Sequence, residues 1–186
     1  MTRLVFIFLV GLSLISFPSW SADFDKGLSA YKRGDFVTAV REWTPLAEQG
    51  DANAQTNLGF MYERGLGVPK DDKEAVRLYR LAAGQGNAKA QNYLGFMYET
   101  GKGIPKDNKE AVRWYRLAAE QGDALGQTSL GVMYRRGLGV PKDNKEAVRW
   151  YRLAAEQGDA GAQTSLGNMY AEGLGVPKDN KEAVRW

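Results

Sequence analysis

The sequence predicts an all-α solenoid, in which helix-turn-helix units stack one on another along the chain. A block that starts at Gly50 recurs from Gly86, Gly122 and Gly158, a period of 36 residues without any insertion. Each copy holds two segments in which apolar residues recur at helical spacing. A loop that contains glycine and proline separates the two segments. Short repeated units of this kind bury their apolar faces by stacking, so the period predicts the fold class.

The composition excludes several classes of functional site. The chain has 186 residues, with no histidine and no cysteine. The missing histidine rules out a serine or cysteine nucleophile that is activated by histidine. The missing histidine and cysteine also rule out zinc and iron sites with the usual ligands, and the missing cysteine rules out disulfides. The formal net charge is only +3, from 25 basic and 22 acidic residues, so no nucleic-acid partner is expected. We predict no catalytic residue, no cofactor and no bound metal.

Residues 1–21 are predicted to form a signal peptide. Arg3 precedes an apolar run from Leu4 to Phe17, and Pro18 and small residues follow it. The run has 14 residues, whereas a membrane span needs about 20. Cleavage near Ser21 would give a periplasmic or secreted protein without a membrane span. The alternative is an uncleaved N-terminal anchor.

Residues 22–49 are predicted to form a shorter first unit related to the repeats. The segment from Gly27 to Gly34 resembles the end of a first repeat helix, and Ala39 to Trp43 resembles a second helix. This unit is similar to a degenerate tetratricopeptide unit, and we expect it to cap the N-terminal end of the stack. The repeats that follow are predicted at residues 50–85, 86–121, 122–157 and, incomplete, 158–186.

Helix ends can be placed from capping residues. In the first repeat, Asp51 is a candidate N-cap, and Gly65 stands where a helix-terminating glycine belongs. Pro69 keeps the two helices apart. The second helix opens with Asp71 and Glu74, which have the spacing of a capping box.

Three positions of the repeats predict close packing. Gly59 lies within a helix, which indicates contact with a neighbouring helix, and the alanine pair Ala118-Ala119 is the expected partner of such a glycine. Trp114 and its counterparts are expected to pack between repeats. Gly126 replaces the usual alanine of the third repeat, so we expect looser packing there.

The pattern read from Ala90 through Ala119 closely resembles the Sel1-like repeat family, and the resemblance extends over residues 50–186. It implies a right-handed α-solenoid related to tetratricopeptide repeats. It also implies a non-catalytic adaptor or scaffold that binds a protein or peptide, and exported bacterial members often serve in the cell envelope. The first helix of each repeat is then expected on the concave side.

Differences among the copies mark a candidate binding surface. Six positions of the first helix vary among the copies, and at helical spacing they fall on one side of the helix, which we call the variable arc. In the first repeat these positions are Asn53, Thr56, Asn57, Phe60, Glu63 and Arg64. We expect a binding groove on this arc, with an aromatic cluster of Phe60, Tyr93 and Phe96. The alternative is a solvent-exposed surface without a partner. The predicted partner-binding residues are Asn57, Phe60, Arg64, Tyr93, Phe96, Val132, Arg136 and Asn168.

Two other functions remain open. Ser29 and Lys32 match the S-x-x-K element of β-lactam-interacting hydrolases, although the companion elements are absent. An envelope protein that binds peptidoglycan or polysaccharide is the other alternative. The fourth repeat stops at Trp186, which fits either a truncated reading or an end covered by a partner or by a second copy, so self-association is possible.

Overall fold

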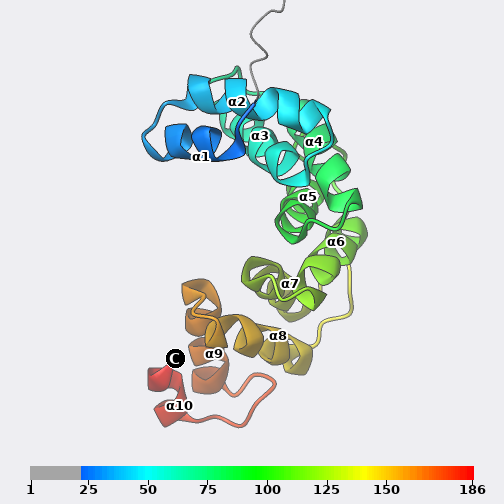
Figure 1. Cartoon of the computed structure of the whole chain (residues 1–186). Coiled ribbons are helices and arrows are strands. Elements are labelled where there is room, and N and C mark those ends of the chain that lie inside the picture. The colour runs from blue at the N-terminus through cyan, green and yellow to red at the C-terminus, as the bar shows by residue number, and fades with distance from the viewer. Residues whose placement is uncertain (1–21) are drawn as a thin grey trace, which may run out of the picture.

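The computed structural model describes residues 22–186, and the predicted signal peptide at residues 1–21 lies outside the described part. Within that part every regular element is a helix, which confirms the all-α prediction (Figure 1). The helices are α1 (Phe24–Lys32), α2 (Phe36–Glu48), α3 (Ala52–Arg64), α4 (Asp72–Gly84), α5 (Ala88–Thr100), α6 (Asn108–Glu120), α7 (Ala124–Arg136), α8 (Asn144–Glu156), α9 (Ala160–Glu172) and α10 (Asn180–Arg185).

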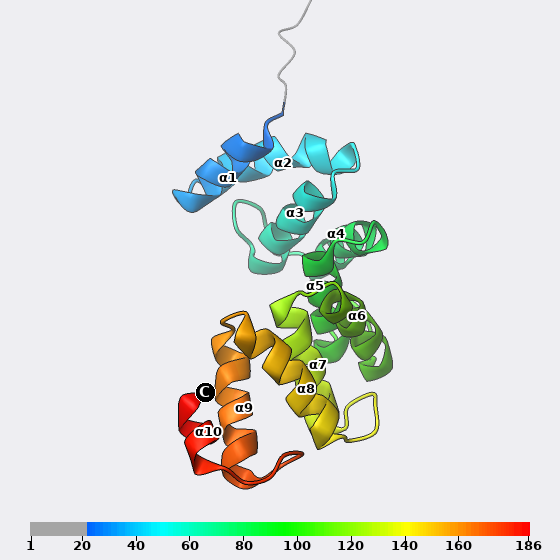
Figure 2. The same cartoon turned by 60° about the horizontal axis from the view of Figure 1, so that its bottom comes forward.

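The helices form a curved stack, as the solenoid prediction requires. Each helix packs mainly against the helices just before and after it in the chain. The odd-numbered helices line the inner side of the curve and the even-numbered helices the outer side (Figure 1). Figure 2 shows the same order from another direction, with α1 and α10 at opposite ends of the stack. The first helix of each repeat therefore lies on the concave side.

The predicted caps are present, but the capping box is only half formed. The Asp71 side chain accepts the backbone N–H groups of Lys73 and Glu74, at 2.9 and 3.0 Å. The backbone N–H of Asp71 donates instead to the carbonyl of Tyr62, at 3.0 Å. Glu74 therefore has no N-cap amide to accept, and it binds Arg77 at 2.7 Å. The expectation of a reciprocal capping box is wrong because the incoming loop already uses that amide.

In the first three repeats, the glycine in the middle of the first helix packs against the ring of a tyrosine in the following helix. A Cβ atom added to Gly59 would lie 2.8 Å from the ring of Tyr79, and one added to Gly95 would lie 2.7 Å from that of Tyr115. Tyr79 is fully buried. The glycine does permit a close helix contact, but the expected alanine partner is wrong, since the tyrosine ring of the same repeat fills the space.

The alanine pairs of the outer helices contact the following repeat. A Cβ atom on Gly126 would lie 2.7 Å from the Cβ of Ala118, closer than two methyl carbons approach. Ala90 and Ala162 hold the same position in other repeats and are fully buried. The absence of a side chain lets α7 approach α6 more closely, so the expectation of loose packing at Gly126 is wrong.

The tryptophan position packs as predicted. Its first occupant, Leu78, is 2% exposed, and Trp150 is 8% exposed. Trp114 is half-buried against the apolar core between α4 and α5, and Trp186 is half-buried against the core between α8 and α9. The position is therefore part of the packing between repeats.

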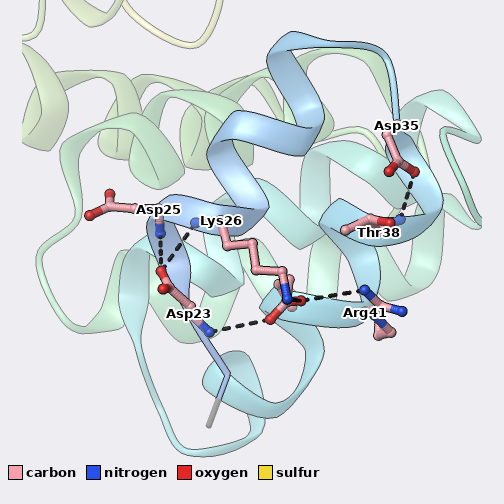
Figure 3. Close-up of polar contacts among 7 residues, drawn as sticks. Asp23, Asp25, Lys26, Asp35, Thr38 and Arg41 are labelled. Carbon is pink, nitrogen blue, oxygen red and sulfur yellow. Dashed lines mark hydrogen bonds and ion pairs between the residues drawn. The ribbon is translucent and has the colours of Figure 1, made fainter. Parts of the chain in front are cut away.

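A buried carboxylate anchors the first unit. Glu42 of α2 is fully buried, and it accepts the backbone N–H of Asp23 at 3.4 Å. Lys26 lies 3.0 Å from the same carboxylate and Arg41 lies 3.6 Å from it. Figure 3 shows Asp23, Lys26 and Arg41 converging on this group. These contacts tie the start of α1 to α2, which places α1 at the inner side of the stack.

A glycine-to-alanine substitution tests the tyrosine contacts. We expect Gly95→Ala to lower the free energy of unfolding by up to about 2 kcal/mol, because overpacking costs about 1–3 kcal/mol and the better helix propensity of alanine offsets about 1 kcal/mol of this. Denaturant titration followed by circular dichroism measures this. Gly84→Ala is the matched control, since a Cβ atom there meets nothing within 4 Å. It is expected to stabilise, and equal stability of the two variants would contradict the packing role.

Candidate functional site

A pocket of about 140 Å³ opens on the inner side of the stack, near its N-terminal end. It is built by α1, α2, α3 and α5, so the first unit and the first two repeats contribute to it. Its lining residues are Leu28, Tyr31, Trp43, Thr56, Asn57, Phe60, Lys89 and Tyr93. Apolar and aromatic side chains dominate the lining, with a few polar groups, as in many ligand sites.

Aromatic rings form a continuous wall of this pocket. The ring centroids of Tyr31 and Phe60 are 6.4 Å apart, and those of Phe60 and Tyr93 are 6.0 Å apart. Tyr93 in turn lies 5.0 Å from the buried ring of Tyr79. Trp43 is 1% exposed and contacts Tyr31, with centroids 6.0 Å apart. The wall is therefore supported from behind, and its rings are held by packing.

Tyr79 and Tyr93 remain neutral phenols, because their surroundings raise the pKa of both hydroxyls. Burial raises the pKa of Tyr93, and the nearby carboxylate of Glu63 raises it further, while Arg64 partly opposes both effects. Burial is also the main cause that raises the pKa of Tyr79, followed by the charge of Glu63. Tyr79 donates a hydrogen bond to Glu63 at 3.0 Å. The arrangement is suited to holding an apolar side chain against neutral rings.

Four of the predicted partner-binding residues come together here. Asn57, Phe60 and Tyr93 line the pocket. The guanidinium carbon of Arg64 lies 5.4 Å from the centroid of the Phe60 ring, at a distance typical of a cation–π contact. Sequence differences between copies thus pointed to residues that are neighbours in space.

The other four predicted residues lie elsewhere. Phe96 is half-buried on α5, with the ammonium of Lys102 5.0 Å from its ring centroid, and it does not line the pocket. Val132 is half-buried against the apolar core of the last repeats. Asn168 lines a separate pocket of about 90 Å³. Arg136 is exposed at the end of α7. The expected aromatic cluster therefore has Tyr31 in place of Phe96.

Part of the variable arc is buried. Thr56 is 3% exposed, Glu63 is 6% exposed and Asn92 is 8% exposed. Glu63 accepts the hydroxyl of Tyr79, and Asn92 accepts the hydroxyl of Ser129 on the next inner helix at 3.3 Å. The expectation of one free face is wrong at these positions, because Glu63 is held by Tyr79 of the outer helix of its own repeat and Asn92 by Ser129 of the next inner helix.

Sequence reasoning missed the contribution of the first unit. Leu28 and Tyr31 line the pocket from α1, yet neither was a candidate. The sequence does contain a signal for Leu28. When Gly27 is aligned with Gly59, Leu28 takes the position that Phe60 holds on the variable arc of the first repeat. Lys89 was on the variable arc, but nothing in the sequence indicated that it borders the pocket.

Other kinds of site were sought over residues 22–186. In that range no cluster of acidic residues, histidines or cysteines has the arrangement of a metal site. No helix there is long and apolar enough to cross a bilayer. Ser29 and Lys32 of the S-x-x-K element are both exposed on α1 and do not line the pocket, so the hydrolase alternative gains no support from them.

Solved structures with the same architecture are similar to this chain. A Sel1 repeat protein from Oxalobacter formigenes is 42% identical, with a TM-score of 0.77 over 88% of this chain and 67% of that one. A protective antigen of uropathogenic Escherichia coli strains that displays an SLR fold is 39% identical, with a TM-score of 0.78 over 86% of this chain. This chain spans only 35% of that antigen.

A more distant structure shares the fold alone. The cysteine-rich protein B of Helicobacter pylori is 23% identical, with a TM-score of 0.55 over 69% of this chain and 92% of that one. No curated protein sequence matches significantly.

The family model for the Sel1 repeat matches four consecutive segments: residues 52–87, 88–123, 124–159 and 160–186. Each segment begins at the first residue of an inner helix. This residue comes two positions after the start that the sequence predicted for the same repeat. The match covers most of the described chain and coincides with the four helix pairs that follow α2. By its repeats and by its architecture, the chain belongs to the Sel1 repeat family.

Proposed function

We propose that this protein is a non-catalytic scaffold that holds a peptide or protein partner on the inner side of its stack. Sel1 repeat proteins are generally protein-interaction scaffolds. The observation that carries the proposal is the aromatic pocket, which is built at positions where the repeats differ from one another. Partner-specific residues are expected at such positions, whereas the shared positions maintain the fold.

The size of the pocket fits one apolar side chain. A cavity of about 150 Å³ holds a benzene molecule, and this pocket measures about 140 Å³. The rings of Tyr31, Phe60 and Tyr93 would contact a phenylalanine or leucine side chain of the partner. We expect an extended partner segment to lie along the aromatic wall, where its backbone amides would reach the Asn57 side chain.

The partner is expected outside the cytoplasm. The signal-peptide pattern of residues 1–21 supports export, with cleavage near Ser21 and a periplasmic or secreted location. Cell fractionation with an intact-mass measurement tests this, since a retained segment would identify an anchored form.

Removal of the aromatic wall is the direct test. We expect Phe60→Ala combined with Tyr93→Ala to reduce partner recovery about tenfold or more, because buried aromatic anchors dominate interface energies. The measurement is crosslinking in the periplasm, affinity capture and quantitative mass spectrometry. Phe96→Ala is the matched control, since this ring holds the position of Phe60 one repeat later but lies outside the pocket.

A second variant separates loss of the pocket from loss of the fold. Asn57→Trp adds a ring to the pocket lining without removing any aromatic contact, so it should block the pocket and leave the helical signal intact. Unchanged partner recovery with both variants, in folded protein, would contradict the proposed function.

A further inference from the structure

One repeated arginine position on the outer side of the stack has a carboxylate partner. One arginine of every outer helix in the repeats pairs with the glutamate three residues before it. These pairs are Arg77–Glu74 at 2.7 Å, Arg113–Glu110 at 3.3 Å, Arg149–Glu146 at 3.3 Å and Arg185–Glu182 at 3.2 Å. The charge of these arginines is thus largely neutralised by the protein itself.

The inner side carries a set of cations of its own. Arg64, Lys89, Arg135 and Arg136 all lie on the variable arc and are exposed. Over residues 22–186, none of these four forms an ion pair with a carboxylate. Their charge is available to a partner.

Two of the three carboxylates of the same arc are held by tyrosine hydroxyls. Glu63 is 6% exposed, and it accepts the hydroxyl of Tyr79. Glu99 is half-buried and accepts the hydroxyl of Tyr115 at 2.7 Å. The exposed carboxylate of the arc, Glu172, lies on α9, where it lines a pocket together with Arg135 and offsets part of the charge of α7. The inner surface formed by α3, α5 and α7 therefore presents mainly positive charge.

The cations lie along the path of an extended chain that enters the pocket. Lys89 lines the pocket, and Arg64 stacks on the Phe60 ring of its wall. Arg135 and Arg136 lie on α7, two inner helices beyond α3. Packed helices are about 8–10 Å apart, so this separation is about 20 Å, which about six residues of extended chain span.

We propose that the partner segment is an acidic peptide with one aromatic or large aliphatic residue. That apolar side chain occupies the pocket, and carboxylates on either side of it contact Arg64 and Lys89 near the pocket and Arg135 and Arg136 on α7. This assignment rests on the proposed function, because it takes the pocket as the binding site. The unpaired inner cations are what select an acidic partner over a neutral or basic one.

Synthetic peptides test the charge and the anchor separately. The probes are peptides of about thirteen residues, because about six extended residues on each side of a central anchor are needed to reach from the pocket to α7. One is polyglutamate with a central phenylalanine, the second replaces glutamate by glutamine, and the third replaces phenylalanine by alanine. Fluorescence anisotropy with the purified protein measures each dissociation constant. We expect the acidic phenylalanine peptide to bind about tenfold or more tightly than either other peptide. Each exposed ion pair contributes only modestly, so the difference from the glutamine peptide requires several pairs together, and added salt should reduce it.

Charge reversal on the protein provides the second arm. Arg64→Glu with Lys89→Glu should weaken the acidic phenylalanine peptide about tenfold or more and should weaken the glutamine peptide much less, because only the acidic peptide gains a charge contact at these two positions. Lys109→Glu with Lys145→Glu is the control, because it changes the net charge equally at exposed outer positions that form no ion pair within the described chain.

The outcomes distinguish the two proposals. Equal binding of the glutamate and glutamine peptides, both lost in Phe60→Ala with Tyr93→Ala, overturns the charge assignment and leaves the scaffold function standing. If Lys109→Glu with Lys145→Glu weakens the acidic phenylalanine peptide as much as Arg64→Glu with Lys89→Glu does, the assignment of its binding site to the inner side is overturned. Absence of binding by every peptide contradicts both the charge assignment and the pocket. Alanine versions of Arg64 and Lys89 keep the test valid if the reversed variant fails to fold.

Discussion

Replacement of Gly103 by alanine is expected to destabilise the protein by about 3 kcal/mol. Gly103 has a φ of +65°, where an L residue costs about 1–2 kcal/mol. Its added Cβ would also collide with the backbone of Asp72 and Lys73, at the start of the outer helix of the preceding repeat. A backbone cannot yield as a side chain can, so overpacking adds about 1–3 kcal/mol. Denaturant titration measures the free energy of unfolding.

Gly122→Ala is the matched control for Gly103→Ala. Its φ is +88°, but its added Cβ would meet nothing within 4 Å. It should therefore show the cost of the backbone conformation alone, about 1–2 kcal/mol. If the two variants are equally stable, the loop of one repeat does not support the helix of the repeat before it.

The second large effect is expected from Trp43→Ala. Trp43 is 1% exposed, and its indole N–H donates to the carbonyl of Phe24 at 3.2 Å. Truncation of a buried tryptophan costs about 3–5 kcal/mol. The loss should be local, because each unit of a solenoid contacts mainly its neighbours. Hydrogen exchange should show α1 and α2 losing protection while α7 and α8 keep theirs.

Trp43→Phe is the conservative comparison. It keeps most of the packed ring and removes the hydrogen bond, so about 1–2 kcal/mol is expected. Peptide binding should fall with Trp43→Ala and largely persist with Trp43→Phe, since Trp43 supports the Tyr31 side of the pocket. Uniform loss of protection along the chain, or unchanged stability, would speak against a locally held first unit.

The sequence predicts the first unit as a relative of the repeats but does not predict its contribution to the pocket. Residues 22–49 were recognised as related to the repeats, but the predicted binding residues all came from the four full copies. Buried Glu42 of α2 contacts Lys26 of α1 and the backbone N–H of Asp23, and no local pattern reveals such a contact between residues far apart in the chain. The pocket accordingly contains Tyr31 and Leu28, which comparison of the full copies could not indicate.

The sequence by itself determined the class of fold, the repeat period, the helix caps and which arc of each inner helix differs among copies. These properties are local or periodic, so they can be read along the chain. Tertiary structure alone decided that tyrosine rings fill the spaces above the inner glycines and that Gly103 contacts the preceding repeat. It also decided which variable residues meet in a pocket, because packing against neighbouring helices buries Thr56 and Glu63 while it leaves Phe60 and Tyr93 partly open. The physical reason is that these contacts join residues from different helices, whose separation in space depends on the packing of the whole stack.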